Sequence, residues 1–232
     1  MTVYFTSDLH FGHPFVAGLR AGHETPDRED WETTAKHDKR VLDIINSHVG
    51  KQDTLYILGD VSSGSRRSMD TAVESISKLN VPVKHRHLIL GNHETRSNGA
   101  IFTELYPLFG EVARQGRIYL PDGLQLILSH YQWRHLMDGT AIPEQSLNAT
   151  TVKLAPNAPV WTENPHEILL HGHTHATHVF DFDGRPGGFK QIHIGWDAWR
   201  RPVSLEELTP LFDETNAREF SIKEHADGIT DA

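Results

Sequence analysis

Five short segments of the chain carry the side chains that could bind metal ions. They are Ser7-Asp8-Leu9-His10, Gly59-Asp60, Gly91-Asn92-His93-Glu94, Ser129-His130-Tyr131 and His171-Gly172-His173-Thr174-His175. Carboxylate, amide and imidazole groups together suit borderline divalent metals such as Mn, Fe and Zn. Two such ions held side by side can drive hydrolysis of a phosphate ester. The residue types therefore favour a metal centre, and a pair of metals bound there could hydrolyse a phosphate ester.

Each of these segments follows an apolar stretch that is typical of a buried strand. The stretches cover residues 3–6, 54–58, 87–90, 124–128 and 167–170. Loops at the carboxyl ends of strands converge in open α/β sheets, and ligand sites form there. Any one of these Asp or His residues could equally be a solvated loop residue. Five such loops in this order favour one common site.

Helical periodicity separates the first three strands. Residues 34–48 and 68–79 place apolar side chains on one face, Ser68 is a candidate N-cap, and a short helix is expected at 101–108. The second half is mostly strand and carries two hairpin signals. The turn at 121–123 would join strands 117–120 and 124–128, and the turn at 183–188 would join strands 178–182 and 189–194. We therefore expect an α/β fold: a four-layer α/β/β/α sandwich of two mixed β-sheets flanked by helices, in a single domain spanning 1–232.

Two regions depart from this pattern. Residues 132–165 form an irregular insertion with four prolines and no clear period. A long loop in a compact domain is often functional, so the insertion is either a partly ordered flap over the site or a tolerated surface insertion. From about residue 213 the chain becomes a polar, acidic tail.

Composition limits the classes of function. The 232 residues include no cysteine, and no apolar run approaches the length of a membrane helix. The first residues lack the basic start and apolar core of a signal peptide, so we expect a cytoplasmic protein without membrane contact. The formal net charge of −9 disfavours avid binding to nucleic acid. Bound divalent cations would still attract a small anionic substrate.

In this order, the five segments resemble the motifs of the calcineurin-like metallophosphoesterases. That family carries D-x-H, G-D, G-N-H-[D/E], a single His and G-H-x-H, and the chain matches all five between residues 8 and 175. The longer Ser7-Asp8-Leu9-His10-Phe11-Gly12-His13, with Trp196-Asp197-Ala198-Trp199, is similar to a small bacterial and phage branch of predicted phosphoesterases. One departure is Ser63, where the family often has an acidic residue.

The resemblance implies a role for each ligand. Asp8, His10 and His175 would hold the first metal, Asn92, His130 and His173 the second, and Asp60 would bridge them. The ions would be two divalent transition metals, with Mn preferred and Fe or Zn as alternatives. A metal-bridging hydroxide would attack phosphorus.

Further residues could assist catalysis or bind the substrate. The resemblance implies that His93 stabilises or protonates the leaving group, and Glu94 could orient His93 through a hydrogen bond. His13, Arg96 and Arg134 are candidate substrate contacts by position alone.

The aromatic segment near the end of the chain has two interpretations. Asp197 or Arg200 could lie beside the metal site. Alternatively, Trp196 and Trp199 close the core, which we favour because paired aromatic residues usually pack.

The leading hypothesis is a metal-dependent phosphohydrolase for small phosphodiesters or phosphomonoesters. A nuclease with the same chemistry is the alternative within this class. A non-catalytic scaffold or protein-interaction module of the same fold, or a metal sensor, would keep the ligands without turnover.

Overall fold

The computed structural model describes residues 1–96, 99–133, 136–137, 140–141, 158–160, 164–180 and 190–213. Most of the irregular insertion expected at 132–165 and nearly all of the tail expected from 213 lie outside these residues.

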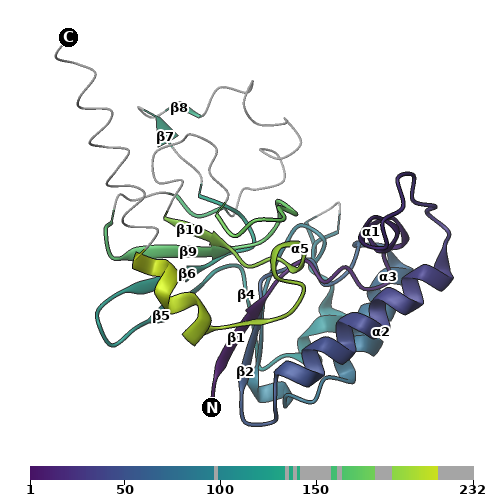
Figure 1. The fold of residues 1–232 in the computed structure, drawn as a ribbon, viewed down its shortest axis with the longest axis horizontal. Helices are drawn as coiled ribbons and strands as arrows, with labels where there is room; N and C mark the ends of the chain where they lie inside the picture. Colours follow the sequence, from purple (N-terminus) through teal and green to yellow (C-terminus); the bar gives the residue numbers. More distant parts are fainter. Residues whose placement is uncertain are drawn as a thin grey trace.

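A five-stranded sheet is formed mainly by the first half of the chain. Its order is β11 (Val203–Ser204), β1 (Val3–Thr6), β2 (Thr54–Ile57), β3 (Arg86–Ile89) and β4 (Glu111–Ala113). The strands β1 to β4 run parallel, and β11 is antiparallel to β1. Helices α2 (Trp31–His48) and α3 (Arg66–Ser77) make the crossovers between β1, β2 and β3 (Figure 1). The expected βαβαβ order of this half is confirmed.

A four-stranded sheet faces the first one. Its order is β10 (Gln191–His193), β9 (Glu167–His171), β6 (Gln125–Leu128) and β5 (Gly116–Tyr119). Strands β10, β9 and β6 are parallel, whereas β5 and β6 form the antiparallel hairpin expected at 121–123. The two mixed sheets with flanking helices confirm the expected fold class. A separate pair joins β7 (Leu136–Met137) to β8 (Thr140–Ala141).

The second expected hairpin is only partly supported. Residues 178–180 are not a strand, although the amide of His193 donates to the carbonyl of Val179 at 2.8 Å. The expected turn at 183–188 lies outside the described residues. Strand β10 pairs with β9 instead. The two strands run parallel, with Gln191 opposite Leu169.

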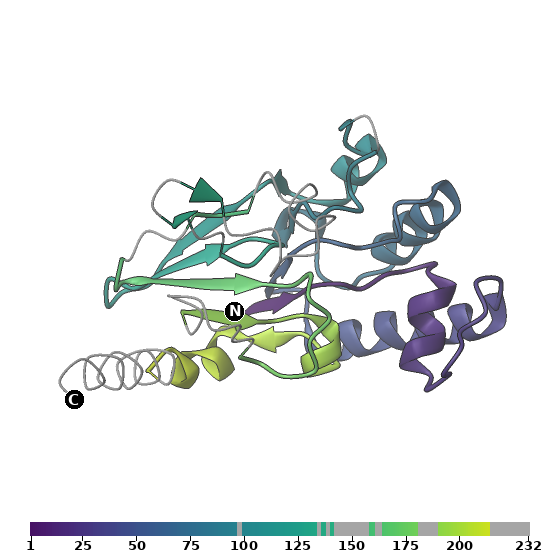
Figure 2. The ribbon, with the colours of Figure 1, turned by 90° about the horizontal axis from the view of Figure 1, so that it is seen from above.

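Alternating side chains of the central strands build two cores. Leu55 and Ile57 of β2 pack toward α2 and α3, where they meet Val41, Ile45 and Ile76. Phe5 of β1 packs between the sheets, in a cluster completed by Leu126, Leu128, Ile168, Leu170, Ile192, Leu208 and Phe212. Figure 2 shows α1, α2 and α3 on the side away from the four-stranded sheet. On the outer face of that sheet, the described residues Ile127, Trp133 and Leu169 form a third, small cluster.

The helix boundaries differ from those expected because polar caps define them. Helix α2 begins at Trp31, three residues earlier than expected, since Asp30 caps it by accepting a hydrogen bond from the Thr33 amide. Ser65, rather than Ser68, caps α3. The helix expected at 101–108 is a 3-10 helix, η2 (Thr103–Leu108). Helix α1 (Pro14–Arg20) was not anticipated.

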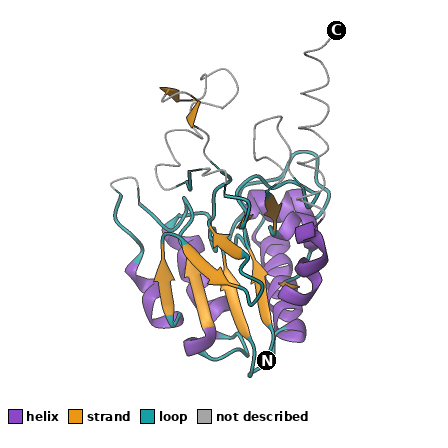
Figure 3. Ribbon diagram, turned by 90° about the vertical axis from the view of Figure 1, so that its left-hand side faces the viewer, coloured by secondary structure: helices purple, strands orange, loops and turns teal. Residues whose placement is uncertain are grey.

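The remaining short elements are η1 (Val83–His85), α5 (Trp196–Trp199) and a helix that includes residues 205–213. None of the described helices combines the length and apolar composition needed to cross a bilayer. The loops that leave the carboxyl ends of the parallel strands gather at one end of the sheets (Figure 3). This end carries all five ligand-bearing segments.

Candidate metal centre

The seven expected ligands lie together in two overlapping groups. Loops after β1, β2, β3, β6 and β9 deliver Asp8, Asp60, Asn92, His130 and His173 within four residues of each strand end. Backbone hydrogen bonds extend the parallel pairing into these loops, from the Asp8 amide to Gly59 and from the His10 amide to the Asp60 carbonyl. The strand order therefore places one loop directly beside the next.

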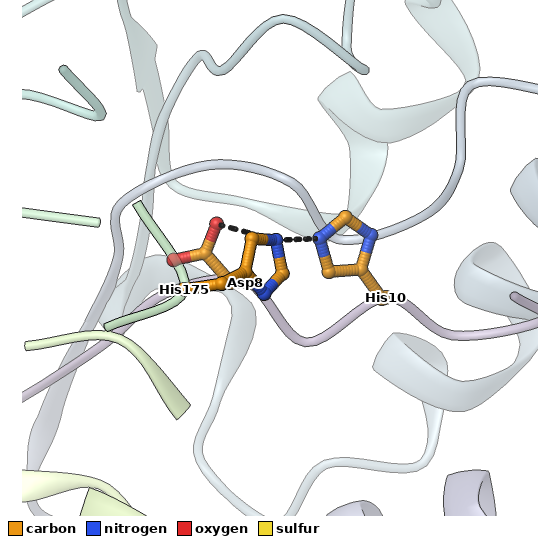
Figure 4. A group of neighbouring side chains, drawn as sticks. All are labelled: Asp8, His10 and His175. Carbon is orange, nitrogen blue, oxygen red and sulfur yellow. Dashed lines mark hydrogen bonds and ion pairs between the residues drawn. The ribbon is translucent and has the colours of Figure 1, made fainter. Parts of the chain in front are cut away.

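The first group contains Asp8, His10 and His175. One ligand atom from each residue lies within 4.8 Å of the other two. The Nε2 atoms of His10 and His175 are 3.1 Å apart, and Nε2 of His175 is 4.0 Å from Oδ1 of Asp8 (Figure 4). Asp8 is fully buried, whereas His175 opens to solvent.

The second group contains Asp60, His130 and His173, with Asn92 beside them. His130 Nε2 lies 3.1 Å from His173 Nδ1, 3.0 Å from Asn92 Oδ1 and 3.4 Å from Asp60 Oδ2. Oδ2 of Asp60 is also 3.9 Å from His10 Nε2, in the first group. Asp60 thus stands between the groups, as a bridging ligand would.

The hydrogen bonds behind the imidazoles orient their lone pairs. Nδ1 of His10 faces the Ser62 carbonyl at 3.1 Å, and Nδ1 of His130 faces the Leu58 carbonyl at 2.8 Å. A carbonyl oxygen can only accept, so each Nδ1 carries the proton and each Nε2 of the neutral ring presents a lone pair. Nδ1 of His175 donates in the same way to the Asp197 carboxylate.

This arrangement fits bound cations. When these rings are neutral, the Nε2 lone pairs of His10 and His175 face each other at 3.1 Å, and that of His130 faces the oxygens of Asn92 and Asp60. Acceptor atoms repel one another at these distances unless a positive charge lies among them. A nitrogen- and oxygen-donor set with fixed imidazoles is also what divalent transition metals prefer.

The ligand loops adopt backbone conformations that are unusual for residues other than glycine. The φ angles are 58° at Asp8, 52° at His10, 54° at Asp60, 70° at His173 and 54° at His175. Such left-handed residues cost free energy and cluster at functional sites, where surrounding contacts hold them. A side chain at Gly172 would overlap Ser7 and the Asp8 carboxylate, so the close approach of the β1 and β9 loops requires glycine there.

Burial and neighbouring charges set the protonation of the ligands. Burial lowers the pKa of His10 well below its ordinary value and the pKa of His173 to about 4, so both rings are neutral at pH 7. Burial would also lower the pKa of His130, but the Asp60 carboxylate outweighs it and raises that pKa to about 10. A positive charge is therefore favoured at this ring, as a proton or as a bound metal.

His93 and Glu94 follow Asn92 but differ in environment. His93 is about one-third exposed, and its Nε2 lies 3.8 Å from Oδ2 of Asp60. The geometry also groups His93 with His10 and Asp60 as possible ligands. Glu94 is fully buried, and its carboxylate accepts from the amides of Asp60, Val61 and Gly91 at 2.9, 2.9 and 2.6 Å.

The expected hydrogen bond from Glu94 to His93 is thus replaced by three bonds to the backbone. Burial, together with the Asp60 carboxylate, raises the pKa of Glu94 to about 7 against the effect of these donors. Glu94 joins the loop after β3 to the loop after β2 and so positions the backbone that carries Asp60 and Asn92.

The three candidate substrate residues have different positions. The ring of His13 lies 5.2 Å from that of His10 and 6.5 Å from that of His93, so His13 borders the centre. Arg96 turns instead to the Phe102 ring, 4.1 Å from its centroid, and to Glu104 at 3.5 Å. Arg134 lies outside the described residues.

Asp197 lies at the site, as the less favoured interpretation of its segment expected, and it is joined there by Arg20, which the sequence patterns did not single out. The Asp197 carboxylate accepts from His175 at 2.8 Å and from Nε and Nη2 of Arg20 at 2.9 and 2.8 Å. Arg20 also donates to the Asp8 and Leu9 carbonyls. Burial would raise the pKa of Asp197, but the bonds from His175 and Arg20 outweigh it and lower that pKa.

The favoured interpretation of the Trp196–Trp199 segment is therefore incomplete. Trp196 does pack in the core, and Trp199 donates to the His193 carbonyl at 2.9 Å. Between them, Asp197 holds His175, one of the expected metal ligands. For Asp197, the signal in the sequence was an acidic residue between two aromatic ones. Arg20 gave no such signal, because it lies on helix α1, which the periodicity did not reveal.

Comparisons with known proteins agree with this geometry. The sequence model for the calcineurin-like phosphoesterase family matches residues 1–177. The chain is 31% identical over 230 residues to the gene 66 protein of Mycobacterium phage D29, covering 91% of this chain and 96% of the phage protein. It is 32% identical over 227 residues to the gene 66 protein of Mycobacterium phage L5, covering 93% of this chain and 96% of the phage protein.

Among solved structures, a protein of unknown function from Aquifex aeolicus has a similar fold. The TM-score is 0.58 at 20% identity, over 90% of this chain and 98% of the Aquifex protein.

Proposed function

Because this chain belongs to the calcineurin-like phosphoesterase family, we propose that it hydrolyses small phosphodiesters or phosphomonoesters with two divalent transition-metal ions. The observation that carries the proposal is the convergence of acceptor atoms from Asp8, His10 and His175 on one side of Asp60 and from His130 and His173 on the other. Two neighbouring groups with one buried carboxylate near both match a dinuclear centre better than a single metal site.

The ligand roles follow from this arrangement. Asp8, His10 and His175 would hold one ion, Asn92, His130 and His173 the other, and Asp60 would contact both. We favour Mn, with Fe or Zn as alternatives, because imidazole, carboxylate and amide ligands are combined. When bound, the ions supply Lewis acidity, which activates water and offsets charge on the phosphate oxygens.

His93 is the residue we assign to the leaving group. Its one-third exposure leaves an edge of the ring open to a substrate, while Asp60 faces its Nε2 at 3.8 Å. A protonated imidazole at this place can donate its proton to the leaving oxygen. We assign His93 this role rather than a ligand role because His10 and Asp60 already belong to the other two groups of ligands.

Small substrates suit the charge of the chain. With a formal net charge of −9, the protein repels a long phosphate backbone, whereas a small ester can reach the cationic centre. His13 would border the bound ester beside His10 and His93. We no longer place Arg96 among the substrate contacts, because its described partners are Phe102 and Glu104.

A substrate panel with added Mn tests the proposal. The substrates are bis(p-nitrophenyl) phosphate, p-nitrophenyl phosphate, cyclic nucleotides and single-stranded DNA. We expect turnover of a small ester, abolished by a chelator and by His10→Ala, and retained by His23→Ala, an exposed histidine outside the ligand set. Activity on DNA alone would indicate the nuclease, and no activity at full metal occupancy would indicate a scaffold or sensor.

A further inference from the structure

A second cavity lies beside the metal centre, between α1, α2 and α5. Its volume is about 410 Å³. The residues that line it are Ala17, Arg20, Ala21, Thr33, Lys36, His37, Arg40, Val41, Ile44, Trp196 and Arg200. Small-molecule sites commonly have volumes of roughly 300–1,000 Å³. The cavity is therefore large enough for a small organic ligand.

Burial separates the lining into an apolar base and a basic rim. Ala17, Val41 and Trp196 are almost fully buried, with exposed fractions of 1%, 1% and 4%. Lys36 and Arg40 are exposed. A ligand seated here would meet apolar side chains at its inner end and positive charge at its outer end.

Most of the basic side chains around the rim have acidic partners, and these partners lie outside the cavity. No Asp or Glu is among the lining residues. Arg20 pairs with Asp197 behind the cavity wall, and Arg200 lies 3.5 Å from the same carboxylate. Lys36 forms an exposed pair with Glu32 on its own helix. Exposed ion pairs of this kind contribute little to stability, so a bound anion can compete for the cation. Within the described part of the chain, Arg40 forms no ion pair, so its charge is available to a ligand.

We propose that this cavity is a second binding site, for a small organophosphate with an apolar or aromatic body. A phosphate group suits the guanidinium and ammonium groups of the rim. A bare inorganic ion would leave the apolar base, formed by Ala17, Val41 and Trp196, in contact with water. A purely apolar ligand would leave the charge of Arg40 without a partner. The combination of both features selects an amphipathic anion.

The cavity is distinct from the metal centre. Arg20 forms part of the wall between them, because its guanidinium reaches the Asp8 carbonyl and the Asp197 carboxylate on the other side. No expected metal ligand lines the cavity. The proposal therefore holds whether or not the metal centre hydrolyses phosphate esters.

Calorimetric titration of the metal-loaded protein with phenylphosphonate tests the proposal. This probe combines a ring with a phosphate-like anion, and its carbon–phosphorus bond resists hydrolysis. We expect two binding events in the wild type, one at the metals and one in the cavity. Arg40→Glu should weaken the cavity event by about tenfold or more. His10→Ala should affect the metal event alone.

Lys51→Glu is the matched control, because it makes the same charge change at an exposed residue outside the cavity. It should retain both events. Inorganic phosphate should bind the cavity more weakly than phenylphosphonate does. The proposal is wrong if the wild type shows a single event that His10→Ala removes, or if Arg40→Glu and Lys51→Glu weaken binding equally. Equal cavity affinities for phosphate and phenylphosphonate would also overturn it.

Discussion

The Nδ1 atom of His175 donates a hydrogen bond to Oδ2 of Asp197 at 2.8 Å. Asp197 is held in turn by two hydrogen bonds from Arg20, which also binds the Asp8 carbonyl. One Arg–Asp pair thus supports both chain segments that supply the first metal group. A carboxylate behind an imidazole fixes the tautomer of a metal ligand and increases its basicity. Asp197 is therefore a positioning residue of the proposed centre.

Asp197→Asn should weaken the first metal by about 10–100-fold, because the amide that replaces the carboxylate is a poorer acceptor for the His175 proton. The second metal, whose ligands do not contact Asp197, should bind as before. Metal titration followed by elemental analysis would measure both affinities.

The control for this change is Asp122→Asn, in the exposed turn between β5 and β6. It should leave both affinities unchanged. In a His175→Ala background, Asp197→Asn should have a smaller effect than in the wild type, because its bond to His175 is already lost. Equal weakening of both metals by Asp197→Asn would contradict the positioning role.

His93→Ala should lower the rate by about 10²–10⁴-fold while both metals remain bound, because a general acid is lost but no assigned ligand is. Steady-state kinetics and elemental analysis on the same preparation would separate the two effects. His23→Ala provides the control. Loss of one metal from the variant would show that His93 is a ligand, as its grouping with His10 and Asp60 permits.

Asp60→Ala should lower the occupancy of both metals, whereas His10→Ala should lower that of the first alone. The reason is that Oδ2 of Asp60 lies near both groups, 3.9 Å from His10 and 3.4 Å from His130. Elemental analysis of the two purified variants distinguishes the outcomes. If Asp60→Ala removed a single metal, Asp60 would not be a bridge.

Glu94→Gln should destabilise the protein by about 2–3 kcal/mol, because an amide nitrogen would replace one acceptor oxygen and leave a buried backbone amide unpaired. The carboxylate accepts from three amides, and a glutamine has only one oxygen to offer. Urea unfolding would give the free-energy change, with exposed Glu29→Gln as the control. An unchanged unfolding midpoint would mean that these bonds contribute nothing to stability.

Much of the architecture follows from local patterns. The apolar strand before each ligand segment and the helical period of 34–48 identify β1, β2, β3, β6, β9 and most of α2. Boundaries were less predictable, because a single side-chain bond decides them, as when Ser65 caps α3 in place of Ser68. Helix α1 was not predicted because about two turns are too few for helical periodicity to show.

The candidate site, like the fold, could be predicted from the sequence only in part. The sequence by itself predicted the candidate ligand set, because a possible metal ligand is recognised by residue type, by its place just after a strand and by the family's motifs. Only the tertiary structure decided what supports that set. Glu94 binds backbone amides rather than His93, and Asp197 meets His175 across 22 positions of the chain. Such partners depend on which loops the sheet order brings together, and no spacing along one segment encodes that order.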